Sequence, residues 1–531
     1  MSITSLNYFG FVAVLLLLYY ILPKKIQWIV LLLGSIGFYL TSDVRYIIFL
    51  GASILITWFF GIRIQKKTDR QKEELKAEGL DRDGKRAIKE KFKKKKRRVL
   101  VLNVIILLGL LYICKYTDFT LDNIKSLSKL LGFSFKKPKI NIILPLGISF
   151  YTFQSIGYIM DVYNEKVTAE KNPLKYALFI SFFPQIVQGP IARFKDLAGQ
   201  LTAEHKFEFK NIKFGFELML YGLFKKLVLA DRIAVMVENV IFDDWSKFGR
   251  YELILAIVLY SIQIYADFSG CMDIITGIAK MFGIELSKNF DHPYFSKTIP
   301  EFWRRWHVSL GTWFKDYVFF PISTAGWFQN LNRKLRKSWG AEAGRIITGI
   351  IPIMVVWFLT GFWHGASWKY IAWGLYHGVL IALGMAFGPL INKGCDKLKI
   401  KRDCFSFRLF QMTRTFILCC IGRVFFISDG LKDGLNILGH IWTHNNPWVL
   451  YSGSIFSNTG LDTYDYVIVF VSILIVWAVS MMQERFKVRE KLEEQNLVFR
   501  WAVVYAAIFI ILIYGMYGAG LNTGDFLYRD F

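Results

Sequence analysis

The sequence predicts an all-α polytopic membrane protein, and three observations carry this prediction. The chain has 531 residues, of which 54% are hydrophobic and 17% aromatic. Its mean hydropathy is positive. Apolar runs that approach the roughly 20 residues required to cross a bilayer recur from one end to the other. A soluble chain of this length would instead divide into domains with polar surfaces. We therefore expect residues 1–531 to form a single membrane domain.

The apolar runs set the expected number of helices. Because several runs are short or interrupted by glycine and proline, we expect about 11–13 transmembrane helices together with re-entrant or interfacial ones. The first run, YFGFVAVLLLLYYIL, has no basic region before it and no small-residue cleavage site after it, so it is expected to be a retained span. The expected segments are 7–22, 27–41, 46–62, 99–115, 142–160, 174–190, 214–231, 252–266, 347–363, 369–390, 412–427, 465–482 and 500–518.

The charge distribution predicts the orientation in the membrane. The chain carries a net charge of +25, and much of it lies between apolar runs. Positive loops favour the cytoplasmic side and anionic lipid, so we expect no nucleic-acid partner. The basic segment 63–98, expected to be a solvated helical hairpin, should be cytoplasmic, as should Lys24, Lys25 and segment 483–499. Counting spans then places the N-terminus and the tail 519–531 on the extracytoplasmic face of the plasma or inner membrane.

Segment 301–320, EFWRRWHVSLGTWFKDYVFF, has too many charges to span lipid. At 100° per residue its apolar side chains fall on one third of the circumference, with Arg304 and Lys315 opposite and His307 at the edge of the stripe. We predict an amphipathic helix, 301–320, that lies at the membrane interface as an interfacial helix or is folded into a cavity. By itself the stripe favours packing over a substrate site. Its members are Phe302, Trp303, Trp306, Leu310, Trp313, Phe314 and Tyr317.

Segment 357–378, WFLTGFWHGASWKYIAWGLYHG, contains a histidine within an apolar run. An ionisable residue at membrane depth is costly, which makes His364 a functional candidate. Gly361 and Gly365 would allow another chain or a ligand to approach it closely. His377, almost on the opposite helical face, is interpreted as structural.

Further polar residues lie in apolar settings and could line an internal path or form helix contacts. The sequence has no G-x-S-x-G, H-E-x-x-H, P-loop or G-x-G-x-x-G motif, so chemistry is expected to rest on histidine. The six cysteines show no C-x-x-C pair; we expect reduced thiols and no metal site. The polar residues are Gln154, Asp161, Gln185, Gln188, Asp267, Asp273, Asn289 and His292.

The blocks RRWHVSLGTWFKDYVFFPI and GFWHGASWKYIAWGLYHG resemble the signatures of the membrane-bound O-acyltransferase (MBOAT) family, in particular its bacterial AlgI/DltB-like branch. The blocks PLGISFYTFQSIGYIMDVY, FFPQIVQGPI, YADFSGCMDI and NFDHPY resemble that branch in the same order, so the likeness covers nearly the whole chain. The length favours the AlgI-like subgroup. The resemblance implies many helices around a central cavity and acyl transfer from a cytoplasmic thioester.

The resemblance also implies site residues. His364 matches the family's invariant histidine and His307 its second histidine. Substrate-binding roles are expected for Asp267, Asn289, Trp303, Arg305 and Trp363. The final residues FLYRDF match the F-x-Y-x-x-F motif of this branch, in which the tyrosine is thought to carry the acyl group. Phe526, Tyr528 and Phe531 occupy its three positions.

The leading hypothesis is an acyl relay across the membrane. His364 would act as general base as Tyr528 attacks a thioester, acetyl-CoA being the expected donor substrate and no cofactor being bound. His307 would orient the donor or stabilise the oxyanion. An extracytoplasmic SGNH-hydrolase-like partner would then acylate a polysaccharide.

Two alternatives remain open from the sequence. One is D-alanyl transfer from a carrier protein to teichoic acid. The other is a transporter, which would also need broken segments and intramembrane polar residues, although the chain shows no repeat of two matching halves.

Overall fold

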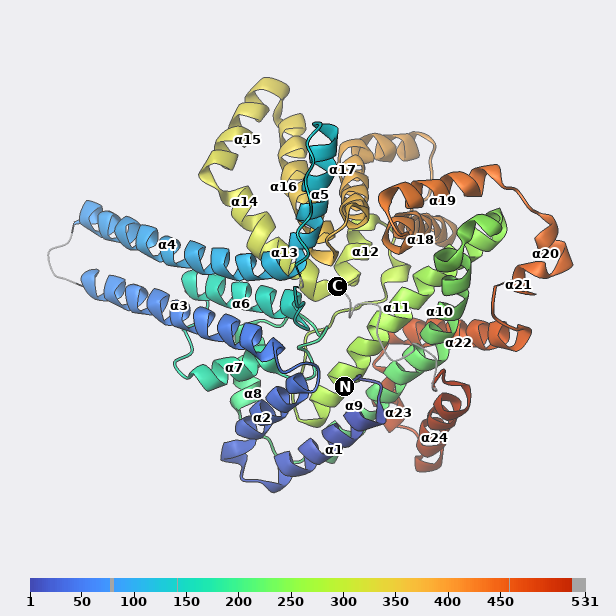
Figure 1. Cartoon of the computed structure of the whole chain (residues 1–531), viewed down its shortest axis with the longest axis horizontal. Helices are drawn as coiled ribbons and strands as arrows, with labels where there is room; N and C mark the ends of the chain where they lie inside the picture. The colour runs from blue at the N-terminus through green and yellow to red at the C-terminus, as the bar shows by residue number, and fades with distance from the viewer. Residues whose placement is uncertain (77–80, 141, 458, 518–531) are drawn as a thin grey trace. The chain divides into compact units, whose positions relative to one another are not determined.

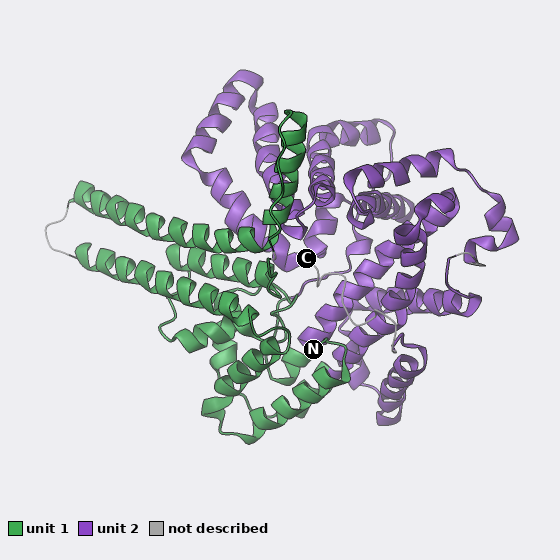
Figure 2. Ribbon diagram, in the orientation of Figure 1, with its two compact units in different colours: residues 1–215, 278–287 green, residues 216–277, 288–531 purple. Residues whose placement is uncertain are grey.

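The computed structural model describes residues 1–76, 81–140, 142–457 and 459–517 (Figure 1). Over these ranges the regular structure is helical, with one isolated antiparallel bridge between Phe290 and Trp306 and no strand. The all-α prediction is therefore confirmed. The chain divides into two compact units (Figure 2): residues 1–215 with 278–287, and residues 216–277 with 288–531.

Unit 1 is built around a long helical hairpin. Helices α3 and α4 pack against each other and both contact α6. Asp81 caps α4 by accepting from the Gly84 backbone N–H at 2.7 Å, as expected for a helix N-terminus. The elements are α1 (Leu6–Ile21), η1 (Lys24–Ile26), α2 (Gln27–Leu40), α3 (Tyr46–Glu74), α4 (Arg82–Lys115), α5 (Thr117–Leu130), α6 (Ile148–Tyr163), α7 (Pro173–Ser181), α8 (Phe194–Thr202) and the start of α9 (Phe209–Leu223).

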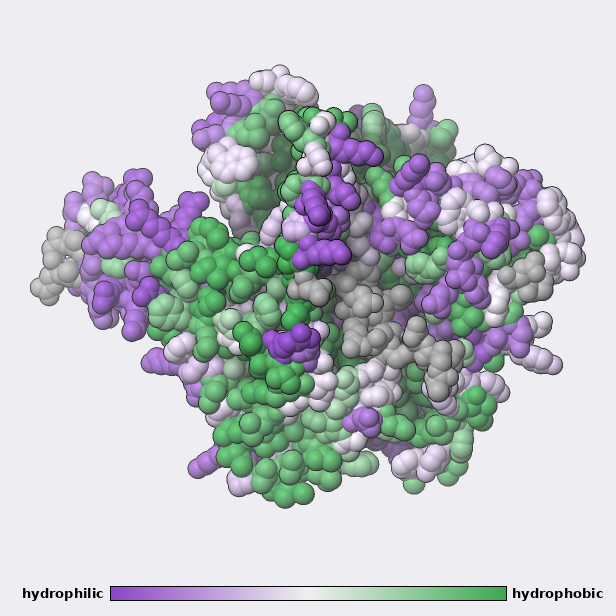
Figure 3. Space-filling view, viewed as in Figure 1, coloured by the Kyte–Doolittle hydropathy of each residue, from purple (hydrophilic) through white to green (hydrophobic). Residues whose placement is uncertain are grey.

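The hairpin matches the helical form expected for segment 63–98. Its far end is strongly hydrophilic and forms the purple projection in Figure 3. At the basic part of the hairpin, Glu165 accepts from Lys96 at 2.8 Å and lies 3.5 Å from Lys72. Since Glu165 follows α6, these ion pairs hold the end of α6 beside the basic part of α3 and α4.

Unit 2 contains most of the remaining helices, and its long helix α11 ends in unit 1. Its elements are η2 (Phe224–Ala230), α10 (Asp231–Val237), η3 (Glu238–Asp243), η4 (Trp245–Lys247), α11 (Arg250–Met281), η5 (Pro293–Phe295), α12 (Ile299–Arg305), α13 (Val308–Phe314), η6 (Lys315–Phe319), α14 (Phe320–Thr324), α15 (Gly326–Trp339), α16 (Ala341–His364), α17 (Trp368–Lys397), α18 (Phe405–Ile427), α19 (Leu431–Thr443), α20 (Trp448–Ser452), α21 (Ser454–Ser457), α22 (Thr463–Gln483), α23 (Val488–Glu493) and α24 (Leu497–Tyr514).

Eight helices within the described ranges are long and apolar enough to cross a membrane: α3, α4, α11, α16, α17, α18, α22 and α24. The shorter apolar helix α1 has 16 residues. Other expected spans form shorter helices, such as α2 with 14 residues and α7 with nine. The region expected at 214–231 changes from α9 to the π-helix η2. The chain is thus a multi-pass membrane protein in which several apolar segments are short or irregular.

The single amphipathic helix expected at 301–320 is wrong. The segment breaks between α12 and α13, where His307 adopts a left-handed backbone with φ 48°, and then continues without interruption from α13 through the π-helix η6 into α14. The stripe expected from periodicity is nevertheless buried at Phe302, Leu310 and Trp313, whereas Arg304 is exposed. These apolar side chains therefore pack inside the protein.

All six cysteines lie in the described ranges and are free thiols. Cys404 is exposed just before α18, and Cys395 near the end of α17 is half-buried. The other four are buried: Cys114, Cys271, Cys419 and Cys420.

Candidate active site

The position of His364 depends on a close crossing of α16 and α17. A Cβ added at Gly361 would lie 2.3 Å from the Tyr370 backbone oxygen, and one at Gly374 would lie 2.3 Å from the Trp357 backbone oxygen. A Cβ at Gly365 would lie 2.2 Å from the Tyr370 ring. The glycines that the sequence suggested would admit another chain therefore admit α17, which packs directly beside the end of α16.

His364 is the last residue of α16 and is 2% exposed. Its ring packs edge-on against Trp373, with centroids 4.9 Å apart, and against Phe426 at 5.5 Å. The adjacent Trp363 ring lies 5.0 Å away. Because these aromatic rings come from α16, α17 and α18, three helices fix the imidazole in an apolar environment.

His307 is held by Asn289, the residue 18 positions earlier in the chain. The Asn289 Oδ1 accepts from the Ser309 backbone N–H at 3.0 Å, which sets the orientation of the amide. The same oxygen lies 3.2 Å from His307 Nδ1. Since an amide oxygen can only accept, Nδ1 carries the proton and Nε2 is the unprotonated nitrogen. Burial lowers the pKa of the His307 imidazole from its ordinary value, which keeps this ring neutral.

The two histidines are connected by aromatic contacts. The Trp363 ring lies 6.1 Å from that of His307, and Trp363 directly precedes His364. Phe268 of α11 also packs on His307, with ring centroids 4.9 Å apart. The structure thus brings together His364, His307, Asn289 and Trp363, four of the residues that the sequence singled out.

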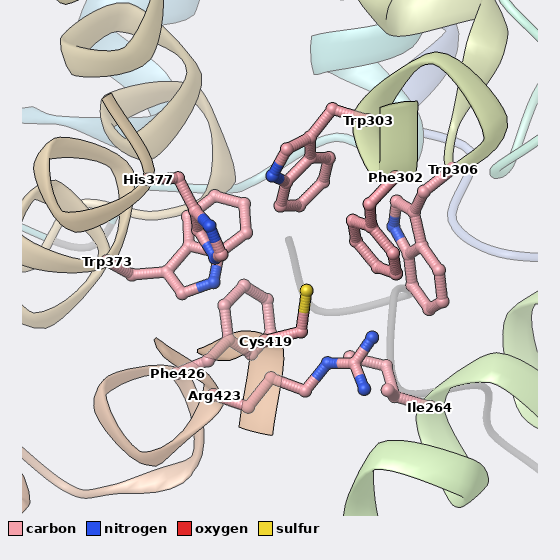
Figure 4. A pocket seen from close by; sticks show the side chains of 9 residues that line it. All are labelled: Ile264, Phe302, Trp303, Trp306, Trp373, His377, Cys419, Arg423 and Phe426. Carbon is pink, nitrogen blue, oxygen red and sulfur yellow. The ribbon is translucent and has the colours of Figure 1, made fainter. Parts of the chain in front are cut away.

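A narrow pocket lies one aromatic layer from His364. Trp373 and Phe426, which pack on His364, also line this pocket (Figure 4). Trp303, expected to bind substrate, lines it as well and packs on His377 with centroids 4.9 Å apart. The full lining consists of Ile264, Phe302, Trp303, Trp306, Trp373, His377, Cys419, Arg423 and Phe426.

Among the pocket residues are His377 and Arg423, which were not expected to bind substrate. His377 was interpreted as structural, and Arg423 was not singled out, although it is a charged residue inside the apolar run 412–427. The criterion that made His364 a candidate, an ionisable residue in an apolar run, also applies to Arg423. Arg423 is 5% exposed and lies within α18.

Two of the expected substrate-binding residues are engaged elsewhere. Asp267 accepts from Lys226 at 2.7 Å, and Lys226 also pairs with Asp231 at 2.8 Å, all three being buried. Arg305 donates to Glu484 at 2.8 Å and lies 3.1 Å from Glu301. Neither Asp267 nor Arg305 lines the pocket, and both are part of ion-pair networks.

The F-x-Y-x-x-F residues Phe526, Tyr528 and Phe531 lie outside the described residues. The chain that leads to them is anchored on unit 2. The Met516 backbone N–H donates to the Leu227 oxygen of η2 at 2.9 Å, and Arg232 Nη2 donates to the Tyr514 oxygen at 2.6 Å. The segment after α24 therefore begins beside η2 and α10.

The fold and this site define a multi-pass helical membrane protein with a buried aromatic pocket and a buried histidine, His364, packed beside it. Comparison with known proteins makes the assignment specific: the chain belongs to the membrane-bound O-acyltransferase family and is an O-acyltransferase. The model of that family matches residues 168–340, which include His307.

Three relatives illustrate the family relationship. The chain is 30% identical over 482 residues to the "Probable alginate O-acetylase AlgI" of Pseudomonas syringae, covering 90% of this chain and 82% of that protein. It is 30% identical to the "Peptidoglycan O-acetyltransferase" of Helicobacter pylori, covering 82% of this chain and 78% of that protein. It is 32% identical over 255 residues to the "Teichoic acid D-alanyltransferase" of Bacillus subtilis, covering 46% and 60%.

Proposed function

We propose that this protein takes an acetyl group from a cytoplasmic thioester and relays it, through an acyl-tyrosine at Tyr528, to the outside for O-acetylation of a cell-surface or secreted polysaccharide. The observation that carries the proposal is the buried His364 at the end of α16, held beside an aromatic pocket and connected through Trp363 to His307. An apolar site of this kind limits the contact of a reactive acyl group with water.

The choice of acetyl over D-alanyl rests on the extent of the likeness. The relatives named as O-acetylases or O-acetyltransferases align with 80 to 90% of this chain. The D-alanyltransferases align with 46 and 48%. Acetyl-CoA is accordingly the proposed donor.

His364 is the proposed general base. As the Tyr528 hydroxyl oxygen forms a bond to the thioester carbonyl carbon, its proton passes to His364. Collapse of the tetrahedral intermediate breaks the carbon–sulfur bond, and the departing thiolate takes the proton back. A histidine can accept this proton only in its neutral form, which is populated near neutral pH for an ordinary imidazole.

His307 is the proposed orienting group. Its unprotonated Nε2 can accept a hydrogen bond but cannot donate one to an oxyanion. Of the two roles expected from the sequence, orientation of the donor or of the incoming phenol is therefore favoured over oxyanion stabilisation.

Tyrosine suits the relay because of its acidity. A thiol has a pKa of about 8.5 and a phenol of about 10, so an aryl ester keeps much of the transfer potential of a thioester. A sugar hydroxyl is a far weaker acid, and its ester is the stable product. Transfer from thioester to Tyr528 to polysaccharide is therefore downhill at each step.

The final transfer requires an extracytoplasmic partner, for which an SGNH-hydrolase-like acyltransferase is proposed. In the proposed orientation both termini lie on the extracytoplasmic side of the membrane, and the α3–α4 hairpin lies on the cytoplasmic side. The positive charge of the hairpin supports that orientation.

The proposal is tested by incubating the purified protein with radiolabelled acetyl-CoA and measuring the intact mass of the C-terminal peptide. One acetyl group is expected on Tyr528 of the wild type, and none in Tyr528→Phe or His364→Ala. Tyr517→Phe is the matched control and should load normally. Wild-type labelling and polymer acetylation by Tyr528→Phe would refute the relay.

A further inference from the structure

Arg423 is a buried cation whose charge is not balanced by a carboxylate. Five lysine and arginine side chains in the described ranges are buried, and four of them pair with Asp or Glu within 4.0 Å: Lys96, Lys225, Lys226 and Arg232. Arg423 takes part in no ion pair within those ranges, although it is 5% exposed and lies in a helix long enough to span the membrane. A buried charge without a counter-ion is costly and indicates a functional role.

The contacts of Arg423 leave part of its guanidinium available to a ligand. Nη1 donates to the Ser261 backbone oxygen at 3.1 Å and to the Tyr294 hydroxyl at 2.8 Å. Within the described residues Nε and Nη2 have no hydrogen-bond acceptor. The guanidinium carbon lies 4.9 Å from the Trp306 ring centroid and 5.5 Å from that of Tyr294. Figure 4 shows the group extending into the pocket below Cys419.

The pocket has the composition of a site for a small acyl group. Aromatic rings form most of its wall, and Arg423 is its one ionic residue. Trp373 and Phe426 contact the His364 ring, so a group held here would lie next to the proposed base. An aromatic wall by itself would attract an ammonium group through cation–π contacts. Here the guanidinium already occupies that position over Trp306.

We propose that Arg423 is a specificity-determining residue that binds an acceptor oxygen of the donor's acyl or pantetheine portion and excludes acyl groups carrying an ammonium. This inference rests on the proposed function and deepens it. It implies that acetyl and other neutral acyl groups are accepted, and that D-alanyl, which carries a positive charge on the carbon next to the carbonyl, is rejected. Like charges a few ångströms apart in this environment should disfavour D-alanyl by roughly 100-fold.

The test compares D-alanyl with D-lactyl pantetheine thioesters, which are nearly equal in size and differ in the charge of one substituent. Wild-type protein is expected to transfer lactyl about 100-fold more efficiently than D-alanyl, measured as kcat/KM for loading. Arg423→Gln should reduce this preference to a few-fold, whereas Arg423→Lys, which keeps the charge, should retain it. An equal preference in the wild type and Arg423→Gln would overturn the proposal.

A binding measurement separates this proposal from the relay. Non-transferable ketone analogues of the two thioesters are added to intact Tyr528→Phe protein, and the increase in Tm is compared. In Tyr528→Phe protein that retains Arg423, the neutral analogue should raise Tm at about 100-fold lower concentration than the ammonium analogue. If that discrimination is present but Tyr528 never becomes acylated, the relay fails and the role of Arg423 stands. Equal stabilisation by the two analogues would refute the role of Arg423 whatever happens at Tyr528.

Discussion

At the scale of single residues, the backbone at His307 accounts for the geometry of the second histidine. Its φ of 48° lies in the left-handed region, which costs a non-glycine residue about 1–3 kcal/mol. Asn289 offsets this cost twice, since its backbone oxygen accepts from Val308 N–H at 3.0 Å and its side-chain oxygen accepts from Ser309 N–H. Asn289 therefore fixes the turn and the ring together, and a direct role in substrate binding is not needed to explain it.

Replacing Asn289 tests this positioning role. Asn289→Leu removes the acceptor of the His307 Nδ1–H, an interaction worth about 1–3 kcal/mol when a buried group loses its partner. The rate of acyl loading should fall roughly 10- to 100-fold. Because both residues act through one imidazole, the losses in Asn289→Leu and His307→Ala should not add in the double variant. Asn289→Asp retains an acceptor oxygen and should lose less; fully additive effects would show that the two residues act independently.

From the sequence, His364 could be singled out as a functional candidate, but the contacts around His307 could not be predicted. An ionisable residue in an apolar run stands out by composition alone. The break in the helix at His307 cannot be recognised in this way. The helical spacing of the apolar residues continues across His307, and apolar residues on both sides of it are buried. Tertiary contacts with Asn289, 18 residues away, decide the backbone at this position. Arg423 was detectable by the same rule as His364 and was not singled out.

At the scale of elements, the crossing of α16 and α17 determines where His364 lies. Gly361 and Gly374 face each other, and a Cβ at Gly374 would lie 3.0 Å from Gly361 Cα. Small residues are what allow membrane helices to approach so closely. The pairing also explains the glycine three residues before His364, at position 361.

Gly374→Ala should separate the two helices and displace His364. The added methyl would meet backbone atoms, which cannot move aside as a side-chain tip can, so we expect a loss of about 1–3 kcal/mol and a lower Tm in detergent. Gly384→Ala in the same helix is the matched control. Nothing lies within 4 Å of a Cβ there, and alanine favours helix by about 1 kcal/mol, so Tm should stay constant or rise. A Tm unchanged by Gly374→Ala would contradict the close crossing.

The apolar runs of the sequence predicted most of the long helices. They did not predict the π-helical segments that interrupt the regular α-helices. The π-helix η2 carries Lys226, which bridges Asp231 and Asp267 in buried surroundings. Hydropathy averages over such a charge cluster and cannot say whether its members pair with one another or with a ligand. Asp267 was therefore expected at the substrate, whereas its contact with Lys226 joins η2 to α11.

At the scale of the whole molecule, composition was sufficient for the class of protein. High hydrophobic content and repeated apolar runs predicted a multi-pass helical protein, and the eight long apolar helices confirm it. The division into two units was not visible in the sequence, because helices α9 and α11 each contribute residues to both. No composition shift marks such a boundary.

The exposed thiol of Cys404 provides a native reporter of sidedness. It follows a basic stretch that includes Lys399, Lys401 and Arg402, so the proposed orientation places it in the cytoplasm. A membrane-impermeant maleimide should leave intact cells unlabelled at this position and modify it after the membrane is opened, with Cys404→Ser as the control for the half-buried Cys395. Labelling of Cys404 in intact cells would contradict the proposed orientation and indicate the opposite one. One native side chain thus allows the orientation of the chain in the membrane to be read without an added tag.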